Sequence, residues 1–132
     1  MDEITCFGLE SHPGPYQSWP LSSRLLLDGR PTATALTGYI IEKQFRTAAG
    51  VVLATSCDCP FEERTTFYLL DDQLGIVDDV TCFTPYDTWL LDRMEPLDES
   101  SFRVVFYSEY ACILRILPRD AGGWLLELGR DE

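Results

Sequence analysis

The chain is short of positive charge. It has 10 Lys and Arg against 22 Asp and Glu, a formal net charge of -12 over 132 residues. Because 45% of the residues are hydrophobic and 12% are aromatic, the composition supports a folded core. We therefore expect the acidic residues to cover a folded surface, which repels nucleic acid and anionic lipid and attracts basic partners.

Long apolar runs are also missing, and none approaches the roughly 18 residues that a membrane helix needs. The first residues, Met1-Asp2-Glu3-Ile4, are acidic where a secretory signal is basic and then apolar. We expect a cytoplasmic protein. The length is close to the commonest domain size and predicts one domain over residues 1–132.

Catalytic signatures are absent. His12 is the only histidine, and the sequence lacks Gly-x-Ser-x-Gly, His-Glu-x-x-His and the phosphate-binding Gly-x-x-x-x-Gly-Lys. No segment has the ligand spacing of a calcium loop. These gaps favour a protein that is not an enzyme and needs no cofactor, although a pair of carboxylates remains an alternative source of acid–base chemistry.

The cysteines form an odd set without a regular framework: Cys6, Cys57, Cys59, Cys82 and Cys112. Zinc sites usually use pairs of Cys-x-x-Cys knuckles, whereas Cys57-Asp58-Cys59 places two thiols on one strand face. We expect reduced, mostly buried thiols and no bound metal.

The hydrophobic pattern is that of strands separated by turns, and it predicts a mainly β fold. About eight strands in hairpin order imply a predominantly antiparallel sheet, curled into a barrel or folded as a two-layer sandwich. Val51, Leu53 and Tyr68 are expected to face the core or a second sheet. The candidate strands span residues 3–9, 24–28, 37–46, 51–57, 64–70, 74–80, 101–107, 111–117 and 124–128.

One segment predicts a short helix, over residues 84–94. Thr84 suits an N-cap, Pro85 suits the first helical position, and Trp89, Leu90 and Met94 then share a helical face. A further strand through residues 88–91 is the alternative.

Two features are candidate binding sites. The first consists of the carboxylates beside and within the hairpin of residues 64–80. The side chains at positions 62 and 63 should lie near those at positions 78 and 79, because the two strands pair. The side chains at positions 71 and 72 should lie at the opposite end, at the tip of the hairpin. An aromatic loop among prolines is the second, either as an interface anchor or, for Trp19, as a cover for one end of the sheet. The candidate partner-binding residues are Glu62, Glu63, Asp71, Asp72, Asp78, Asp79, Tyr16 and Trp19.

In its size, acidity and aromatic–acidic hairpin Phe67-Tyr68-Leu69-Leu70-Asp71-Asp72, the chain resembles the small immunity proteins of bacterial toxin systems. That resemblance implies a protein that neutralises a basic protein partner such as a toxin, often a nuclease. Two alternatives remain: a small-ligand carrier on an up-and-down β-barrel, and a carboxylate-dependent enzyme.

Overall fold

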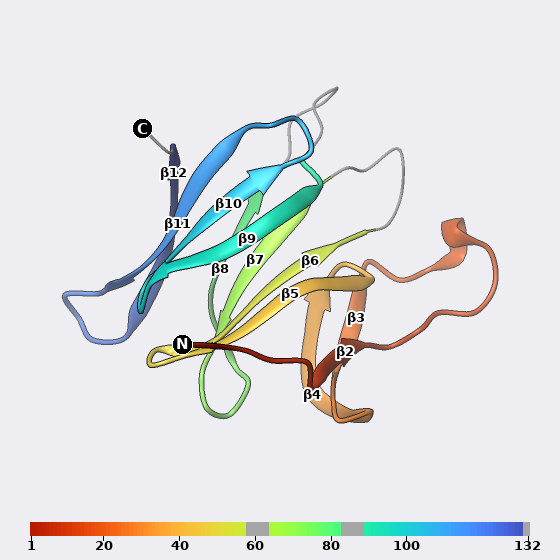
Figure 1. Cartoon of the computed structure of the whole chain (residues 1–132). Helices are drawn as coiled ribbons and strands as arrows, with labels where there is room; N and C mark the ends of the chain where they lie inside the picture. The colour runs from red at the N-terminus through yellow and green to blue at the C-terminus, as the bar shows by residue number, and fades with distance from the viewer. Residues whose placement is uncertain (58–63, 83–88, 131–132) are drawn as a thin grey trace.

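The computed structural model describes residues 1–57, 64–82 and 89–130, and these residues form three antiparallel sheets. The chain is mainly β, as the sequence predicts. Each sheet has two edge strands, so the described strands make open sheets and no closed barrel. Two sheets pack on opposite faces of a third, which gives three layers (Figure 1). The sequence suggested either a barrel or a sandwich of two layers.

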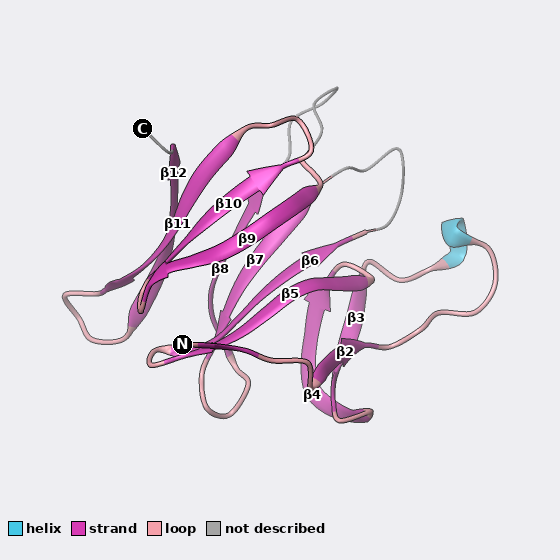
Figure 2. Ribbon diagram, in the orientation of Figure 1, coloured by secondary structure: helices cyan, strands magenta, loops and turns pink. Residues whose placement is uncertain are grey.

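The central sheet has the strand order β1-β5-β6-β7-β8. Its strands are joined mainly by the hairpins that the sequence predicts, and its edge strand β1 comes from the start of the chain (Figure 2). The bounds are β1 Asp2–Glu3, β5 Ile40–Thr47, β6 Gly50–Ser56, β7 Thr65–Leu70 and β8 Ile76–Cys82.

A four-stranded sheet covers one face of the central sheet, with the order β12-β11-β10-β9. A three-stranded sheet, β2-β3-β4, covers the other face. The bounds are β2 Phe7–Leu9, β3 Ser22–Leu27, β4 Arg30–Thr37, β9 Leu91–Asp98, β10 Ser101–Phe106, β11 Ala111–Pro118 and β12 Trp124–Arg130.

Alternation in the central strands explains the three layers. Successive side chains of a strand point to opposite faces, and in β6 and β7 both sets are buried. Val52 and Phe67 pack in the core shared with the four-stranded sheet. Val51, Leu53 and Tyr68 pack in the core shared with the three-stranded sheet, so the prediction that they face a core or second sheet is confirmed.

The first predicted strand is divided between two sheets. After β1 the chain leaves the central sheet and enters β2, and Gln44 of β5 bridges the step. The Gln44 side chain accepts a hydrogen bond from the Phe7 backbone N–H at 2.9 Å and donates one to the Phe7 carbonyl at 3.0 Å. This amide replaces a strand neighbour for Phe7 and holds the three-stranded sheet against the central one.

The predicted helix over residues 84–94 is wrong where the structure describes it, because Leu91–Asp98 is strand β9. Its residues 84–88 lie outside the described residues. Met94 pairs with Val104, Arg93 with Val105 and Leu91 with Phe106, which leaves Asp92 as an extra residue in a bulge. The bulge puts Leu91 and Met94 on the same core-facing side, and this spacing of three imitates a helical face.

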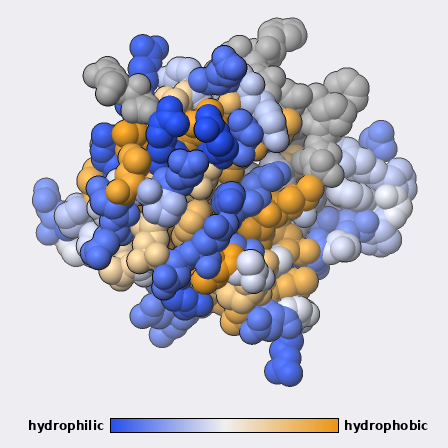
Figure 3. All heavy atoms as spheres, in the orientation of Figure 1, coloured by the Kyte–Doolittle hydropathy of each residue, from blue (hydrophilic) through white to orange (hydrophobic). Residues whose placement is uncertain are grey.

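The four-stranded and central sheets also meet along their edges, since β12 lies beside β8. Polar and apolar side chains are interleaved over the face seen in Figure 3, with hydrophobic ones gathered toward its middle. Among the described residues, no helix is long and apolar enough to cross a membrane.

Candidate functional site

The Asp71–Asp72 turn joins β7 to β8 and is shaped by its own first carboxylate. Asp71 Oδ1 accepts hydrogen bonds from the backbone N–H groups of Gln73 and Gly75, both at 2.9 Å. Leu74 adopts a left-handed conformation, with φ of 64°, and its N–H donates to the Asp71 carbonyl at 2.9 Å. Asp72 is exposed and makes none of these turn contacts, so its carboxylate faces solvent.

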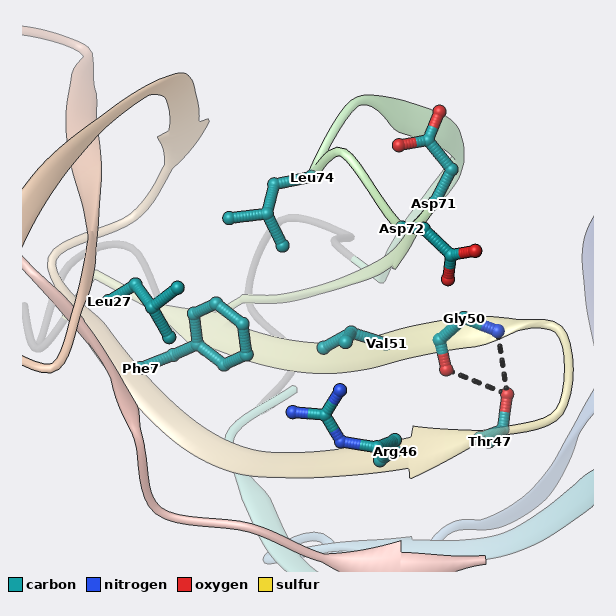
Figure 4. Close-up of a pocket in the computed structure, with 9 residues that line it drawn as sticks. All are labelled: Phe7, Leu27, Arg46, Thr47, Gly50, Val51, Asp71, Asp72 and Leu74. Atoms are coloured by element: carbon teal, nitrogen blue, oxygen red, sulfur yellow. Dashed lines mark hydrogen bonds between the residues drawn. The ribbon is translucent and has the colours of Figure 1, made fainter.

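A pocket of about 290 Å³ lies beside this turn, between the ends of the central and three-stranded sheets (Figure 4). One side is apolar, formed by Phe7 of β2, Leu27 of β3, Val51 of β6 and Leu74 of the turn. The other side is polar. Its residues are Arg46, Thr47, Gly50, Asp71 and Asp72.

Arg46 supplies the positive charge of the pocket. It lies in β5 opposite Asp2 of β1 and Val51 of β6, so these three side chains share the face that carries the three-stranded sheet. Figure 4 shows its guanidinium directed toward Phe7 and away from the carboxylates of Asp71 and Asp72. Within the described part of the chain, Arg46 makes no ion pair or side-chain hydrogen bond.

The hairpin carboxylates have different environments from those that the sequence suggests. Asp78 and Asp79 lie inside β8 and not at its end, since β8 continues to Cys82. Asp78 points toward the four-stranded sheet, where its Oδ2 accepts a hydrogen bond from Leu126 N at 2.8 Å and lies 3.8 Å from Arg119 Nη2. Asp78 therefore joins two sheet edges, while Asp79 is exposed on the opposite face of β8.

Glu62 and Glu63 lie outside the described residues. The predicted proximity of these residues to Asp78 and Asp79 therefore stays a prediction. Asp71 and Asp72 do occupy the tip of the β7–β8 hairpin, as predicted.

The aromatic loop between β2 and β3 contains one 3-10 turn, Tyr16–Ser18. Tyr16 and Trp19 are half-buried and gather with His12 and Tyr39. Ring centroids lie 5.3 Å apart for Tyr16 and Trp19, and 5.0 Å apart for Trp19 and Tyr39. Trp19 therefore packs on the fold, and its role as an interface anchor stays a prediction.

The described cysteines are free thiols, and Cys57, Cys82 and Cys112 are buried. Burial raises the pKa of Cys82 to about 12, with a smaller contribution from neighbouring Cys112. Among the described residues, no three His, Cys, Asp or Glu side chains are grouped so that they could hold a metal ion. Nothing in the part of the chain that the structure describes points to an enzyme.

Sequence reasoning missed several residues that form the pocket and the aromatic cluster. Phe7, Leu27 and Arg46 come from three separate strands, and Tyr39 precedes β5 by one residue. No local motif marks them, since they meet only when the three-stranded sheet packs on the central one. Comparison with known proteins adds no relative: no protein-family model, curated protein or solved structure matches the chain.

Proposed function

We propose that this chain is a non-catalytic, acidic binding protein that captures a basic protein partner at the Asp71–Asp72 turn and its pocket. The type of function is that of an immunity or inhibitor protein that neutralises a partner such as a bacterial toxin. The observation that carries the proposal is the pocket, where an apolar side and two carboxylates adjoin at an exposed hairpin tip.

The rest of the fold supports binding at the surface. The two cores are filled by buried side chains from facing sheets, and the larger described pocket is the one at the hairpin tip. The net charge of -12 gives the whole molecule an attractive field for a basic partner. Such a field raises the association rate, whereas the local pocket sets the binding geometry.

The pocket favours a partner segment with an apolar side chain next to a basic one. The apolar side chain would contact Phe7, Leu27, Val51 and Leu74, and the basic one would pair with exposed Asp72. Buried apolar anchors commonly dominate interfaces, and a neighbouring rim charge mainly affects specificity and association rate. Arg46, at the same pocket, offers a second charged contact of opposite sign.

Two matched variants test the site. Asp72→Lys and Asp79→Lys change the charge equally on the same hairpin, and both residues are exposed, but only Asp72 lines the pocket. The partner is first captured from the native host by pull-down with the wild-type protein. We expect Asp72→Lys to weaken its binding by at least tenfold, about 1.4 kcal/mol, and Asp79→Lys to change it much less.

The association rate should also fall as salt rises, because the Debye length shrinks from about 30 Å at 0.01 M to about 10 Å at 0.1 M. Equal effects of the two variants would remove the pocket from the proposal and leave only a general charge effect. A captured partner that is acidic, or capture that is unaffected by either variant and by salt, would overturn the proposal.

The carrier alternative depends on the same pocket, since the described strands form no closed barrel. A volume of about 290 Å³ is at the lower end of the roughly 300–1,000 Å³ that small-molecule sites occupy. A carrier would therefore hold a small ligand with an apolar part and a charged end. Native mass spectrometry of protein purified from its host distinguishes the two, because a carrier retains a bound small molecule.

A further inference from the structure

A second, smaller pocket lies at the aromatic loop, on a different part of the three-stranded side of the fold. Its volume is about 160 Å³, and Glu10, Ser11, His12, Trp19, Tyr39 and Ile40 line it. Three aromatic rings and one carboxylate thus surround a space equal to that of about five liquid waters. This volume suits a chemical group at the end of a side chain and not a whole cofactor.

The rings are held together by one another. The His12 centroid lies 5.7 Å from that of Trp19 and 5.5 Å from that of Tyr39, and the Trp19 and Tyr39 centroids are 5.0 Å apart. The His12–Tyr39 and Trp19–Tyr39 pairs are edge-to-face. Such packing fixes the orientation of the rings before any ligand arrives.

The N–H and O–H groups of these rings that have a defined partner bond within the protein. Trp19 Nε1 donates to the Gly14 carbonyl at 3.1 Å, and the Tyr39 hydroxyl donates to the Pro20 carbonyl at 2.7 Å. Ser23 Oγ donates to the Gly38 carbonyl at 2.7 Å, so His12 Nε2, 2.8 Å from that oxygen, must donate its own proton to it. With these N–H and O–H groups engaged, the rings offer mainly π surface to the pocket.

Glu10 gives the pocket its charge. Its Oε1 accepts a hydrogen bond from the Arg24 backbone N–H at 2.8 Å, which fixes the carboxylate beside the rings. The Arg24 guanidinium donates to the Thr32 carbonyl at 3.1 Å, along the three-stranded sheet. Aromatic surface next to a fixed carboxylate is the environment that attracts an organic cation, through the ring quadrupole and through charge.

We propose that the pocket formed by Glu10, His12, Trp19 and Tyr39 binds the cationic end of a Lys or Arg side chain. That this side chain belongs to a basic protein partner rests on the proposed function. The ability of the pocket to bind an organic cation does not. The acidic turn and this pocket then recognise two separate basic residues of one partner. Two contacts with one partner give the interface a defined orientation that a single charged contact cannot give.

The pocket is tested without the partner by NMR titration with butylammonium, which mimics Lys, and propylguanidinium, which mimics Arg. Ring currents should shift the signal of the methylene next to the nitrogen of each probe upfield in a saturable way, and more strongly than its methyl signal. Butanol, a neutral molecule of matched length, should show no comparable saturable shift. A shift as large with butanol would show that the pocket binds apolar groups without preference for a cation, and it would overturn the proposal. The lack of any saturable shift with both cations would also overturn it.

Variants assign the response to the pocket. Trp19→Ala should weaken probe binding roughly 2- to 30-fold, the range expected for one cation–π contact, while Trp124→Ala on β12 should leave it unchanged. Glu10→Gln keeps the shape of the side chain and an oxygen that can accept a hydrogen bond from Arg24 N. This variant should weaken the binding of the two cationic probes only. Glu99→Gln, at an exposed position outside the pocket, is the matched control. Equal effects of Trp19→Ala and Trp124→Ala would place the binding elsewhere.

Because Trp19→Ala also removes ring packing, Trp19→Phe serves as a second variant. It keeps an aromatic face and should retain most of the probe binding. Failure of the two proposals is distinguishable. If the probes bind but Asp72→Lys leaves partner capture intact, the acidic-turn proposal fails alone; if Asp72→Lys weakens capture but no probe binds, this inference fails alone.

Discussion

At the scale of single residues, the molecule is organised by which face of a central strand each side chain occupies. Leu53 is fully buried between the central and three-stranded sheets, and Ala54, the next residue, is fully buried toward the four-stranded sheet. One-residue alternation thus serves two cores. A substitution in β6 or β7 consequently reports on one core or the other.

Leu53→Ala should lower the free energy of unfolding by roughly 2–5 kcal/mol, because it leaves a cavity in a packed core. Leu21→Ala is the control, since Leu21 is 85% exposed and its loss should cost less than about 0.5 kcal/mol. Chemical denaturation of the two variants measures both values. A loss below about 0.5 kcal/mol for Leu53→Ala would contradict its buried placement.

Cys82 should be unreactive in the folded protein. Burial raises its pKa to about 12, so the thiol stays protonated at neutral pH, and the thiolate is the reactive form. Among the described cysteines, half-buried Cys6 should react first with a thiol reagent, and Cys82 only after denaturation. Mass spectrometry of peptides labelled before and after unfolding checks this order; labelling of Cys82 as fast as Cys6 would contradict it.

The same shift predicts a loss of stability in alkali. The folded-state pKa of Cys82 lies above the ordinary value of 9.0, so its contribution is complete below pH 9 and is lost as the pH rises toward 12. Cys82→Ala should flatten that decline relative to the wild type. Equal slopes of unfolding free energy against pH between 9 and 12 would show that Cys82 does not cause it.

At the scale of elements, two joints hold strands in place without forming a regular ladder. Gln44 connects β5 to β2, and Asp78 connects β8 to β12. The carboxylate of Asp78 satisfies a backbone N–H at the edge of the four-stranded sheet, an atom that would otherwise lack a strand neighbour. Asp78 thus has contacts that serve the fold, and its expected role in partner binding stays a prediction.

Asp78→Ala should destabilise the protein by about 1–3 kcal/mol, because it leaves the Leu126 N–H without its acceptor. The effect should be local, with faster hydrogen exchange at Leu126 and along β12. Asp79→Ala is the matched control, one residue away and exposed. Equal exchange rates at Leu126 in the two variants would contradict the role of Asp78 in holding β12 against β8.

The β5–β6 hairpin depends on a glycine. Gly50 has a φ of 141°, and a Cβ atom there would overlap the carbonyl oxygen of Leu70 in the neighbouring strand. Gly50→Ala should therefore destabilise the fold by more than about 1 kcal/mol. Gly8→Ala in β2 is the control, since no atom lies within 4 Å of its added Cβ. Thermal unfolding of both variants measures the difference, and equal midpoints would contradict this account.

At the scale of the whole molecule, the fold carries its charge on the outside of three layers. Described carboxylates are exposed or half-buried, whereas the buried positions hold hydrophobic residues and a few hydroxyl groups. With a net charge of -12, the surface carboxylates repel one another in the folded state. The same excess of negative charge produces a field that attracts cations. The same charge thus affects both stability and association.

Added salt should consequently raise the melting temperature of the isolated protein. Between about 0.01 M and 0.1 M NaCl the Debye length falls from about 30 Å to about 10 Å, which weakens the repulsion among surface carboxylates. Differential scanning calorimetry at a fixed neutral pH measures the shift. A melting temperature that falls over this range would show that the four described ion pairs outweigh the repulsion.

The sequence by itself determined the mainly β class and the succession of hairpins, because alternation and turn residues are local signals. It also determined the buried positions of Val51, Leu53 and Tyr68. Strand β9 escaped prediction because its bulge at Asp92 imitates helical spacing, and β4 because its small and polar residues alternate weakly at a sheet edge.

Only the tertiary structure decided the number of layers and the composition of the pockets. A short continuous apolar run such as that of β6 is typical of a strand with two buried faces, but it does not show which distant strands cover them. Arg46 meets Phe7 and Leu27 because the three-stranded sheet folds back on the central one, and Asp78 accepts a hydrogen bond from β12 because the two sheet edges lie side by side. Contacts between residues far apart in the chain carry no local pattern, so they follow from packing alone.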